Sequence, residues 1–137
     1  MLTTSLIIRG NEHFKVRSAA RRFGLGRDSY VMKGELRTVG PNKGTPLPCS
    51  TLRINLSTKL DIAKHMAEVE AKLDQILSLI ALEQKRHTCI LEVYLATGLT
   101  VGHKKKYYTR TTTLSPTLMA KLAALDIHYQ ISSYPSY

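Results

Sequence analysis

The sequence has no tryptophan, only two phenylalanines and only two cysteines. Cys49 and Cys89 lie far apart, with no CxxC pair and no histidine at the spacing of a zinc site. The chain therefore has neither the disulfide framework of a small secreted domain nor the pattern of a structural zinc module. We expect two reduced, partly buried thiols and no metal.

Long apolar runs are also missing. No stretch approaches the roughly eighteen consecutive apolar residues that a transmembrane helix needs. The first residues, MLTTSLIIRG, have no basic region, and their apolar run is too short for the core of a signal peptide. We expect a cytoplasmic protein with no membrane segment.

Acidic residues are scarce, with ten Asp and Glu against twenty Lys and Arg and a formal net charge of +10. The excess is uneven: residues 1–60 hold eleven basic and three acidic residues, whereas residues 61–137 hold nine and seven. A field of this sign favours a polyanion or a protein with an acidic face as partner. The alternative is that the charge only keeps the protein soluble.

A length of 137 residues fits a single domain over 1–137. Residues 24–49 are rich in glycine, proline and charge and predict a long irregular segment, with a small hairpin around SYVMKGELRTV. Asn11 is a candidate helix cap, and Thr58 with Asp61 resembles a capping box. Apolar patterning predicts strands at 5–10, 50–58, 88–97, 105–114 and 127–134, and helices after Asn11, over 59–84 and from Pro116.

The predicted order is β-α-β-α-β-β-α-β, with a turn over Gly98–Gly102 joining two strands into a hairpin. A hairpin at this place favours a mostly antiparallel sheet. The fold class is therefore α+β, with the helices packed on one face of the sheet.

A search for catalytic chemistry finds no constellation. The sequence has no HExxH, no GxSxG and no phosphate-loop glycine pattern, and we expect no cofactor and no enzymatic activity. Asp28 and Glu35 are better explained by ion pairing with nearby arginines than as an acid/base pair. Each histidine is expected at the surface or at its boundary: His13, His65, His87, His103 and His128.

A basic surface is the remaining signal, and it defines the candidate partner-binding residues. Tyr107 and Tyr108 are neighbours in a predicted strand, so only one ring can point outward. No recognised nucleic-acid-binding module is present, so nucleic acid stays an alternative partner. The candidate residues are Arg17, Arg21, Arg22, Arg27, Lys33, Arg37, Lys104, Lys105, Lys106, Tyr108 and Arg110.

The C-terminal stretch LSPTLMAKLAALDIHYQISSY, residues 114–134, resembles the ending of a small bacterial family with a domain of unknown function. The preceding stretch TLRINLSTKLDIAKHMAEVEAKLDQIL is similar to that family in its order of strand and helix. The family usually has a tryptophan where this chain reads STLRI. Its members are associated with the immunity proteins of polymorphic toxin systems.

The resemblance implies an antitoxin that binds a cognate toxin and covers its active site. Because the chain is basic, we expect a toxin with an acidic cleft, such as an ADP-ribosyltransferase with a catalytic glutamate. Two alternatives stay open: a basic nucleic-acid-binding accessory protein, and a mobile-element inhibitor of a host defence complex.

Overall fold

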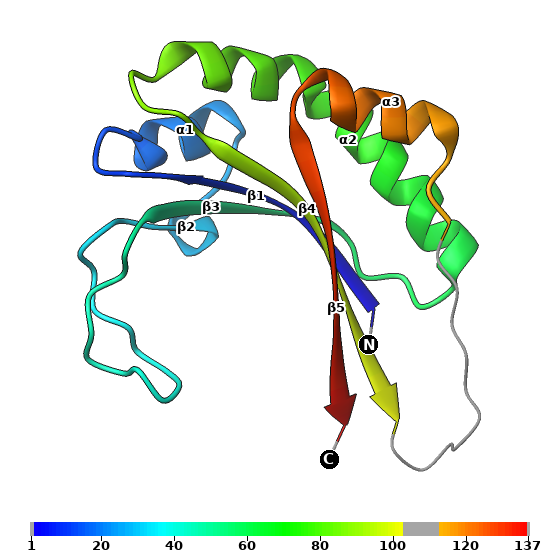
Figure 1. Ribbon diagram of the computed structural model, residues 1–137, viewed down its shortest axis with the longest axis horizontal. Coiled ribbons are helices and arrows are strands. Elements are labelled where there is room, and N and C mark those ends of the chain that lie inside the picture. Colours follow the sequence, from blue (N-terminus) through cyan, green and yellow to red (C-terminus); the bar gives the residue numbers. More distant parts are fainter. Residues whose placement is uncertain (1, 103–112, 137) are drawn as a thin grey trace. The chain divides into compact units, whose positions relative to one another are not determined.

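Five strands and three helices make up the part of the chain that the computed structural model describes, residues 2–102 and 113–136 (Figure 1). One sheet holds the strands in the order β2-β3-β1-β4-β5. The strands are β1 (Leu2–Gly10), β2 (Tyr30–Val31), β3 (Ser50–Ser57), β4 (Glu92–Gly102) and β5 (Ile127–Ser136). The helices are α1 (Val16–Arg22), α2 (Ile62–Arg86) and α3 (Pro116–Ala124), with a 3₁₀ turn, η1, at Arg27–Ser29.

The predicted α+β class with a mostly antiparallel sheet is confirmed. The sheet is mixed because β4 and β5 run in the same direction and are joined through α3 (Figure 1). The predicted turn over Gly98–Gly102 is wrong, since β4 continues to Gly102. Leu99, Thr100 and Val101 lie between these glycines, and their strand preference prevails. The predicted strand at 105–114 lies, except for its last two residues, outside the described residues.

The chain divides into two compact units. The first unit holds residues 1–6, 55–75 and 94–137, and the second unit holds residues 7–54 and 76–93. Because β1, β3, α2 and β4 contribute residues to both units, the division follows no single break in the chain. A single domain over 1–137 stays a prediction.

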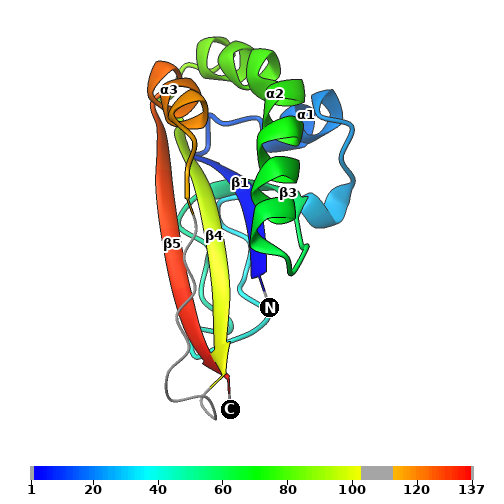
Figure 2. The same cartoon turned by 90° about the vertical axis from the view of Figure 1, so that its right-hand side faces the viewer.

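In the first unit, α3 and the beginning of α2 lie on the same side of β4 and β5 (Figure 2). The predicted start of α3 is confirmed: the Ser115 hydroxyl accepts a hydrogen bond from the amide of Leu118 at 3.0 Å, and Pro116 occupies the first turn. Most buried side chains of this unit are apolar residues from its strands and both helices. They include Leu2, Leu6, Leu56, Val69, Leu73, Leu95, Leu118, Leu122 and Ile127.

The long helix starts later than predicted. α2 begins at Ile62, and the Asp61 carboxylate accepts a hydrogen bond from the amide of Lys64 at 3.0 Å, so Asp61 caps the helix in place of Thr58. On the outer face of α2, Lys72 and Glu68 form an ion pair one helical turn apart, with 3.6 Å between Nζ and Oε1. Glu68 also binds Lys59 at 2.9 Å.

A buried polar chain runs through the first unit. His65 is fully buried, so its expected boundary position is wrong. Its Nδ1 donates to the carbonyl of Lys59 at 2.9 Å, which leaves Nε2 to accept a hydrogen bond from Thr4 at 2.6 Å. The Thr4 hydroxyl lies 2.9 Å from that of Thr97, which accepts from Tyr129 at 3.4 Å. This chain satisfies groups that burial would otherwise leave unpaired.

In the second unit, α1 begins only at Val16, because Asn11 caps a turn and not the helix. The Asn11 side chain accepts from the amide of His13 at 2.8 Å, and its carbonyl accepts from the amide of Phe14 at 3.0 Å. Gly10 permits this turn: a Cβ at Gly10 would lie 2.6 Å from the Cβ of Phe14. Phe14 and Val16 are thereby buried at the start of α1.

The segment over 24–49 is more regular than predicted. Gly24, with φ of 72°, follows the end of α1 in a left-handed conformation that glycine adopts readily. Tyr30 pairs with Leu52 across β2 and β3, so the predicted hairpin forms with β3 and not within 29–39. The chain between these strands then folds back on itself through an antiparallel bridge between Leu36 and Pro46.

The buried imidazole of the first unit provides a stability test. We expect His65→Leu to lower the free energy of unfolding by about 2–3 kcal/mol, because it keeps most of the volume but leaves Thr4 and the Lys59 carbonyl without their partner. Urea denaturation measures the loss. His13→Leu, at an exposed position, is the control. A change below about 0.5 kcal/mol in His65→Leu would show that the chain contributes little.

Candidate partner-binding surface

The positive charge gathers in the second unit, which holds twelve Lys and Arg against five Asp and Glu. The first unit holds eight against five. Four of those eight lie in 104–110, outside the described residues. Among the described residues, the basic excess therefore belongs to the second unit.

A buried ion cluster organises this unit. The guanidinium of Arg22, on α1, binds the carboxylate of Glu83, on α2, in a two-pronged contact: Nε donates to Oε1, and Nη2 donates to Oε2 at 2.8 Å. His87 Nε2 donates to the same Oε2 at 2.7 Å. The side chains of Glu83 and His87 are each only 3% exposed, although His87 as a whole residue has intermediate exposure and so lies at the boundary, as expected. The cluster joins α1 to the end of α2.

The environment of Glu83 keeps its carboxylate charged. Burial raises the pKa of Glu83, but the hydrogen bonds from Arg22 and His87, with the positive charge of these groups, outweigh it and lower the pKa below its usual value. The same contact raises the pKa of Arg22. One positive charge of the surface is therefore neutralised inside the cluster.

A pocket of about 250 Å³ opens beside this cluster; we call it the Arg22 pocket. Among the described residues, the ammonium of Lys15 has no hydrogen bond or ion pair. Within the part of the chain that the structure describes, Arg86 has only Glu83 within reach, at 4.0 Å, and about half of its side chain is exposed. The lining residues are His13, Lys15, Ser18, Arg22, Arg86, His87 and Thr88.

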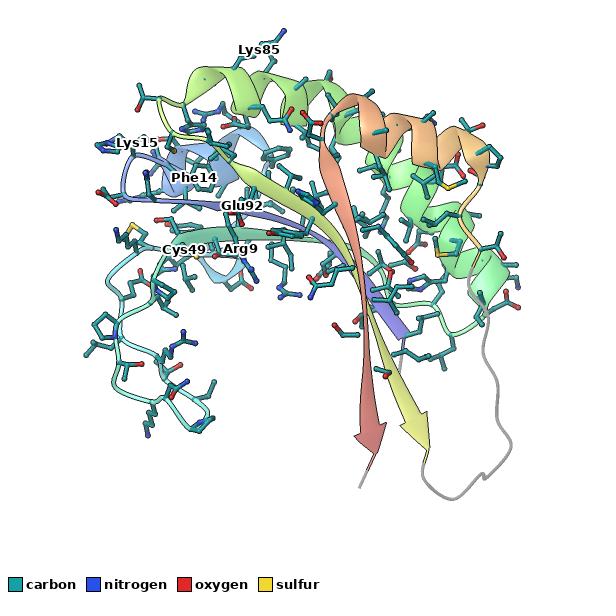
Figure 3. All side chains as sticks on the ribbon, in the orientation of Figure 1. Arg9, Phe14, Lys15, Cys49, Lys85 and Glu92 are labelled. Atoms are coloured by element: carbon teal, nitrogen blue, oxygen red, sulfur yellow. The ribbon has the colours of Figure 1, made fainter. Side chains whose placement is uncertain are left out.

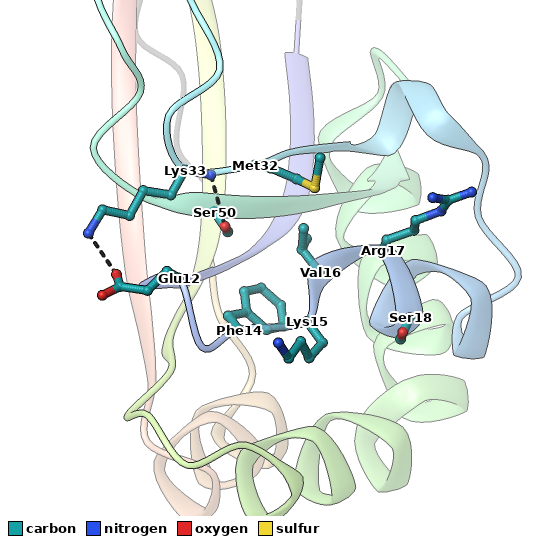
Figure 4. Close-up of a pocket in the computed structure, with 9 residues that line it drawn as sticks. All are labelled: Glu12, Phe14, Lys15, Val16, Arg17, Ser18, Met32, Lys33 and Ser50. Carbon is teal, nitrogen blue, oxygen red and sulfur yellow. Dashed lines mark hydrogen bonds and ion pairs between the residues drawn. The ribbon is translucent and has the colours of Figure 1, made fainter.

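A second pocket, of about 300 Å³, lies next to it; we call it the Met32 pocket (Figure 4). An exposed ion pair bounds it, in which Lys33 Nζ donates to Glu12 at 2.7 Å and lowers the pKa of Glu12. The Lys33 amide donates to the hydroxyl of Ser50 at 2.9 Å. The lining residues are Glu12, Phe14, Lys15, Val16, Arg17, Ser18, Met32, Lys33 and Ser50.

Three of the predicted partner-binding residues meet at these pockets. Arg17 and Lys33 line the Met32 pocket, and Arg22 lines the Arg22 pocket. Arg21 is exposed on α1 but lines neither pocket. Arg37 lies in the hairpin after β2, where its amide donates to the carbonyl of Thr45 at 2.9 Å.

Arg27 is engaged in contacts within the chain. Its Nη1 donates to the carbonyl of Tyr30 at 2.6 Å, its Nη2 binds Glu35 at 2.6 Å, and its guanidinium lies over the ring of Tyr30 at 4.6 Å. This confirms the predicted ion pairing for Glu35. The other candidates, Lys104, Lys105, Lys106, Tyr108 and Arg110, lie outside the described residues.

A third pocket of the second unit is bounded by Arg9, Cys49 and Glu92 (Figure 3) and has a volume of about 410 Å³. Ile90, which also lines it, is 92% exposed. Cys49 and Cys89 are both free thiols of intermediate exposure, as expected. Over residues 2–102 and 113–136, no group of three His, Cys, Asp or Glu side chains is placed to hold a metal ion.

Within the same ranges, no helix is both long enough and apolar enough for a bilayer crossing. A comparison of the chain with protein-family models, with curated proteins and with solved structures gave no match. The resemblance to the immunity-associated family therefore remains a prediction.

The sequence did contain a signal for the residues that the prediction missed. The buried positions of α2 follow helical spacing through Val69, Leu73 and Ile80. Continuing the same spacing leads to Glu83 and His87 in one direction and to His65 in the other. A polar residue on an apolar stripe predicts a buried partner, and Arg22 supplies one for Glu83.

The cluster predicts unequal effects of two neighbouring arginines. We expect Arg22→Ala to lower the free energy of unfolding by about 2 kcal/mol, because it removes the main partner of a buried carboxylate, although Arg22 is itself 27% exposed. Arg21→Ala, the control on the same helix, should change it by less than about 0.5 kcal/mol. Equal losses in the two variants would contradict the buried cluster.

The cluster also predicts how the stability difference between wild type and Arg22→Ala depends on pH. Because the pKa of Glu83 is lowered in the folded state, its contribution to stability is present above the ordinary value of 4.5 and is lost as the pH falls through the folded pKa. The difference in unfolding free energy between wild type and Arg22→Ala should therefore shrink as the pH falls below 4.5. Denaturation between pH 7 and pH 3 measures this; a difference that stays constant would refute the assignment.

Proposed function

We propose that this chain is an immunity protein that binds a cognate bacterial toxin through the basic surface of its second unit and blocks the toxin's active site. One observation carries the proposal. Lys15 and Arg17 are exposed and lack an ion-pair partner among the described residues, and Arg86 has only a distant one. These cations surround two neighbouring pockets, so the surface is ready to receive an acidic partner.

The burial and the hydrogen-bond partners of three titratable side chains support a binding role over a catalytic one. His65 is used in a buried hydrogen-bond chain, and Glu83 binds both His87 and Arg22. A general acid or base must reach its substrate, and all three side chains are almost fully buried. Most exposed charged groups around the two pockets are lysines and arginines, which suit charge recognition, and the exposed carboxylate of Glu12 is paired with Lys33.

The expected partner is a toxin with an acidic cleft. An enzyme that uses a catalytic glutamate on a nucleotide cofactor, such as an ADP-ribosyltransferase, presents a carboxylate at its active site. A long basic side chain such as Arg17 can reach into such a cleft and pair with the carboxylate. We further propose that the protein acts in the cytoplasm, where it would protect the cell that makes the toxin.

Capture from the native host tests this function. The tagged chain is recovered after nuclease treatment at about physiological salt, and co-purifying proteins are identified by mass spectrometry. We expect one stoichiometric protein that is toxic when expressed alone and harmless when co-expressed with this chain. Recovery of nucleic acid alone, lost at raised salt, would contradict the proposal and favour the nucleic-acid-binding alternative.

Charge removal locates the interface of that complex. We expect Lys15→Ala combined with Arg17→Ala to weaken binding of the captured toxin by about tenfold or more, because two unpaired cations are lost from the surface. The control combines Lys64→Ala and Lys85→Ala, which removes the same charge from exposed positions outside both pockets. Isothermal titration calorimetry measures both. Equal weakening would mean that net charge alone, and not this surface, drives association.

A further inference from the structure

We propose that the Met32 pocket and the Arg22 pocket form one two-point docking site for an acidic segment of the partner protein. A large apolar side chain enters the Met32 pocket, and a neighbouring carboxylate enters the Arg22 pocket. The inference rests on the proposed function for the identity of the partner as a protein. It goes further by naming the two contacts through which the partner is recognised.

The two pockets are adjacent: they share two lining residues, and a ring contact joins the lining of one to that of the other. Lys15 and Ser18, at the start of α1, line both of them. Phe14 lines the Met32 pocket, His87 lines the Arg22 pocket, and their rings meet edge to face with centroids 4.9 Å apart. Side chains two residues apart in an extended segment point the same way about 7 Å apart, so one short segment can fill both pockets.

The Met32 pocket suits an apolar side chain. Phe14 and Val16, which line it, are each only 2% exposed, so they provide a fixed apolar wall. Met32 is 43% exposed, and its flexible thioether can adapt to the shape of an incoming residue. In Figure 4 the pocket lies between the start of α1 and the segment that carries Met32 and Lys33.

The Arg22 pocket suits a carboxylate. Glu83 fixes the guanidinium of Arg22 and the imidazole of His87, so that wall is preorganised. Lys15 has no partner among the described residues, and the exposed half of Arg86 can turn to an incoming anion. A guanidinium beside an ammonium is a favourable site for a carboxylate because both groups donate charge-assisted hydrogen bonds.

The aromatic residues of the second unit favour a protein over a nucleic acid here. Single-stranded nucleic acids stack their bases on exposed rings. Phe14 and Tyr30 are buried, and Phe23 is half-buried. Since the second unit has no other Phe, Tyr or Trp residue, its basic surface offers no fully exposed phenyl, phenol or indole ring for base stacking.

Matched variants distinguish loss of a contact inside the two pockets from a general loss of charge or apolar surface. Arg86 lines the Arg22 pocket, whereas its neighbour Lys85 lines neither pocket and points away from the body of the second unit in Figure 3. Arg86→Ala and Lys85→Ala therefore remove the same charge from adjacent residues. For the apolar contact, Met32→Ala is matched by Leu82→Ala, whose side chain is 51% exposed on α2.

The test uses synthetic peptides and nuclear magnetic resonance of the full chain. The probe is a capped ten-residue peptide of Gly and Ser that carries one Leu between two Glu residues at alternate positions. Two control peptides replace Leu by Ala or both Glu by Gln. We expect the probe to shift the Met32 methyl signal and the amide signals of Lys15 and Arg86 saturably, with both control peptides weaker by about fivefold or more.

The variants of the protein test the same two contacts through their affinity for the probe peptide. Arg86→Ala and Met32→Ala should each weaken the probe by about threefold or more, while Lys85→Ala and Leu82→Ala change its affinity by less than about twofold. No saturable shift at these residues, or equal weakening by Lys85→Ala and Arg86→Ala, would overturn the proposal. A ten-nucleotide oligo-dT that binds the same residues more tightly than the probe would overturn it in favour of nucleic acid.

The proposed function and the docking site can fail separately. If a toxin is captured and neutralised but binds Met32→Ala and Arg86→Ala as tightly as wild type, the docking site is refuted and the immunity function stands. If the peptide binds as described but no toxin is recovered, the docking site stands and the immunity function falls.

Discussion

The contact between Arg22 and Glu83 is the interaction on which the candidate surface depends. It fixes the short helix α1 against the end of α2, and His87 completes the contact from the following turn. Without this contact, Lys15, at the start of α1, would not be held in a fixed position relative to Arg86, at the end of α2. A seven-residue helix has little stability of its own, so this tertiary contact determines where its basic side chains lie.

The long helix α2 combines an apolar stripe with a buried polar residue in each unit. In the first unit, His65 is satisfied by a backbone carbonyl and by Thr4. In the second unit, Glu83 is satisfied by Arg22 and His87. The two environments differ: the first is a chain of hydrogen bonds that involves hydroxyl groups and a backbone carbonyl, whereas the second holds an ion pair and borders a pocket. This difference directs the functional proposal to the second unit.

Periodicity predicted the elements well where one face is apolar, as in α2 and in β3. Boundaries failed where a side chain has two possible roles: Asn11 caps a turn instead of α1, and Asp61 takes the capping role expected of Thr58. The sequence predicted which basic residues belong to the candidate surface, but not their positions in space or their ion-pair partners. Charge alone cannot distinguish Arg27, which is engaged with Glu35, from Arg17, which is not, because the pairing depends on the hairpin after β2.

The central claim is that the basic surface of the second unit is the interface with a neutralised toxin. Hydrogen–deuterium exchange of the chain with and without that toxin tests it most directly. The account predicts slower exchange over residues 12–18, 32–33 and 84–88, around the two pockets, and unchanged exchange over residues 127–133 of β5. Protection confined to β5 or to α3, with none around the pockets, would contradict it.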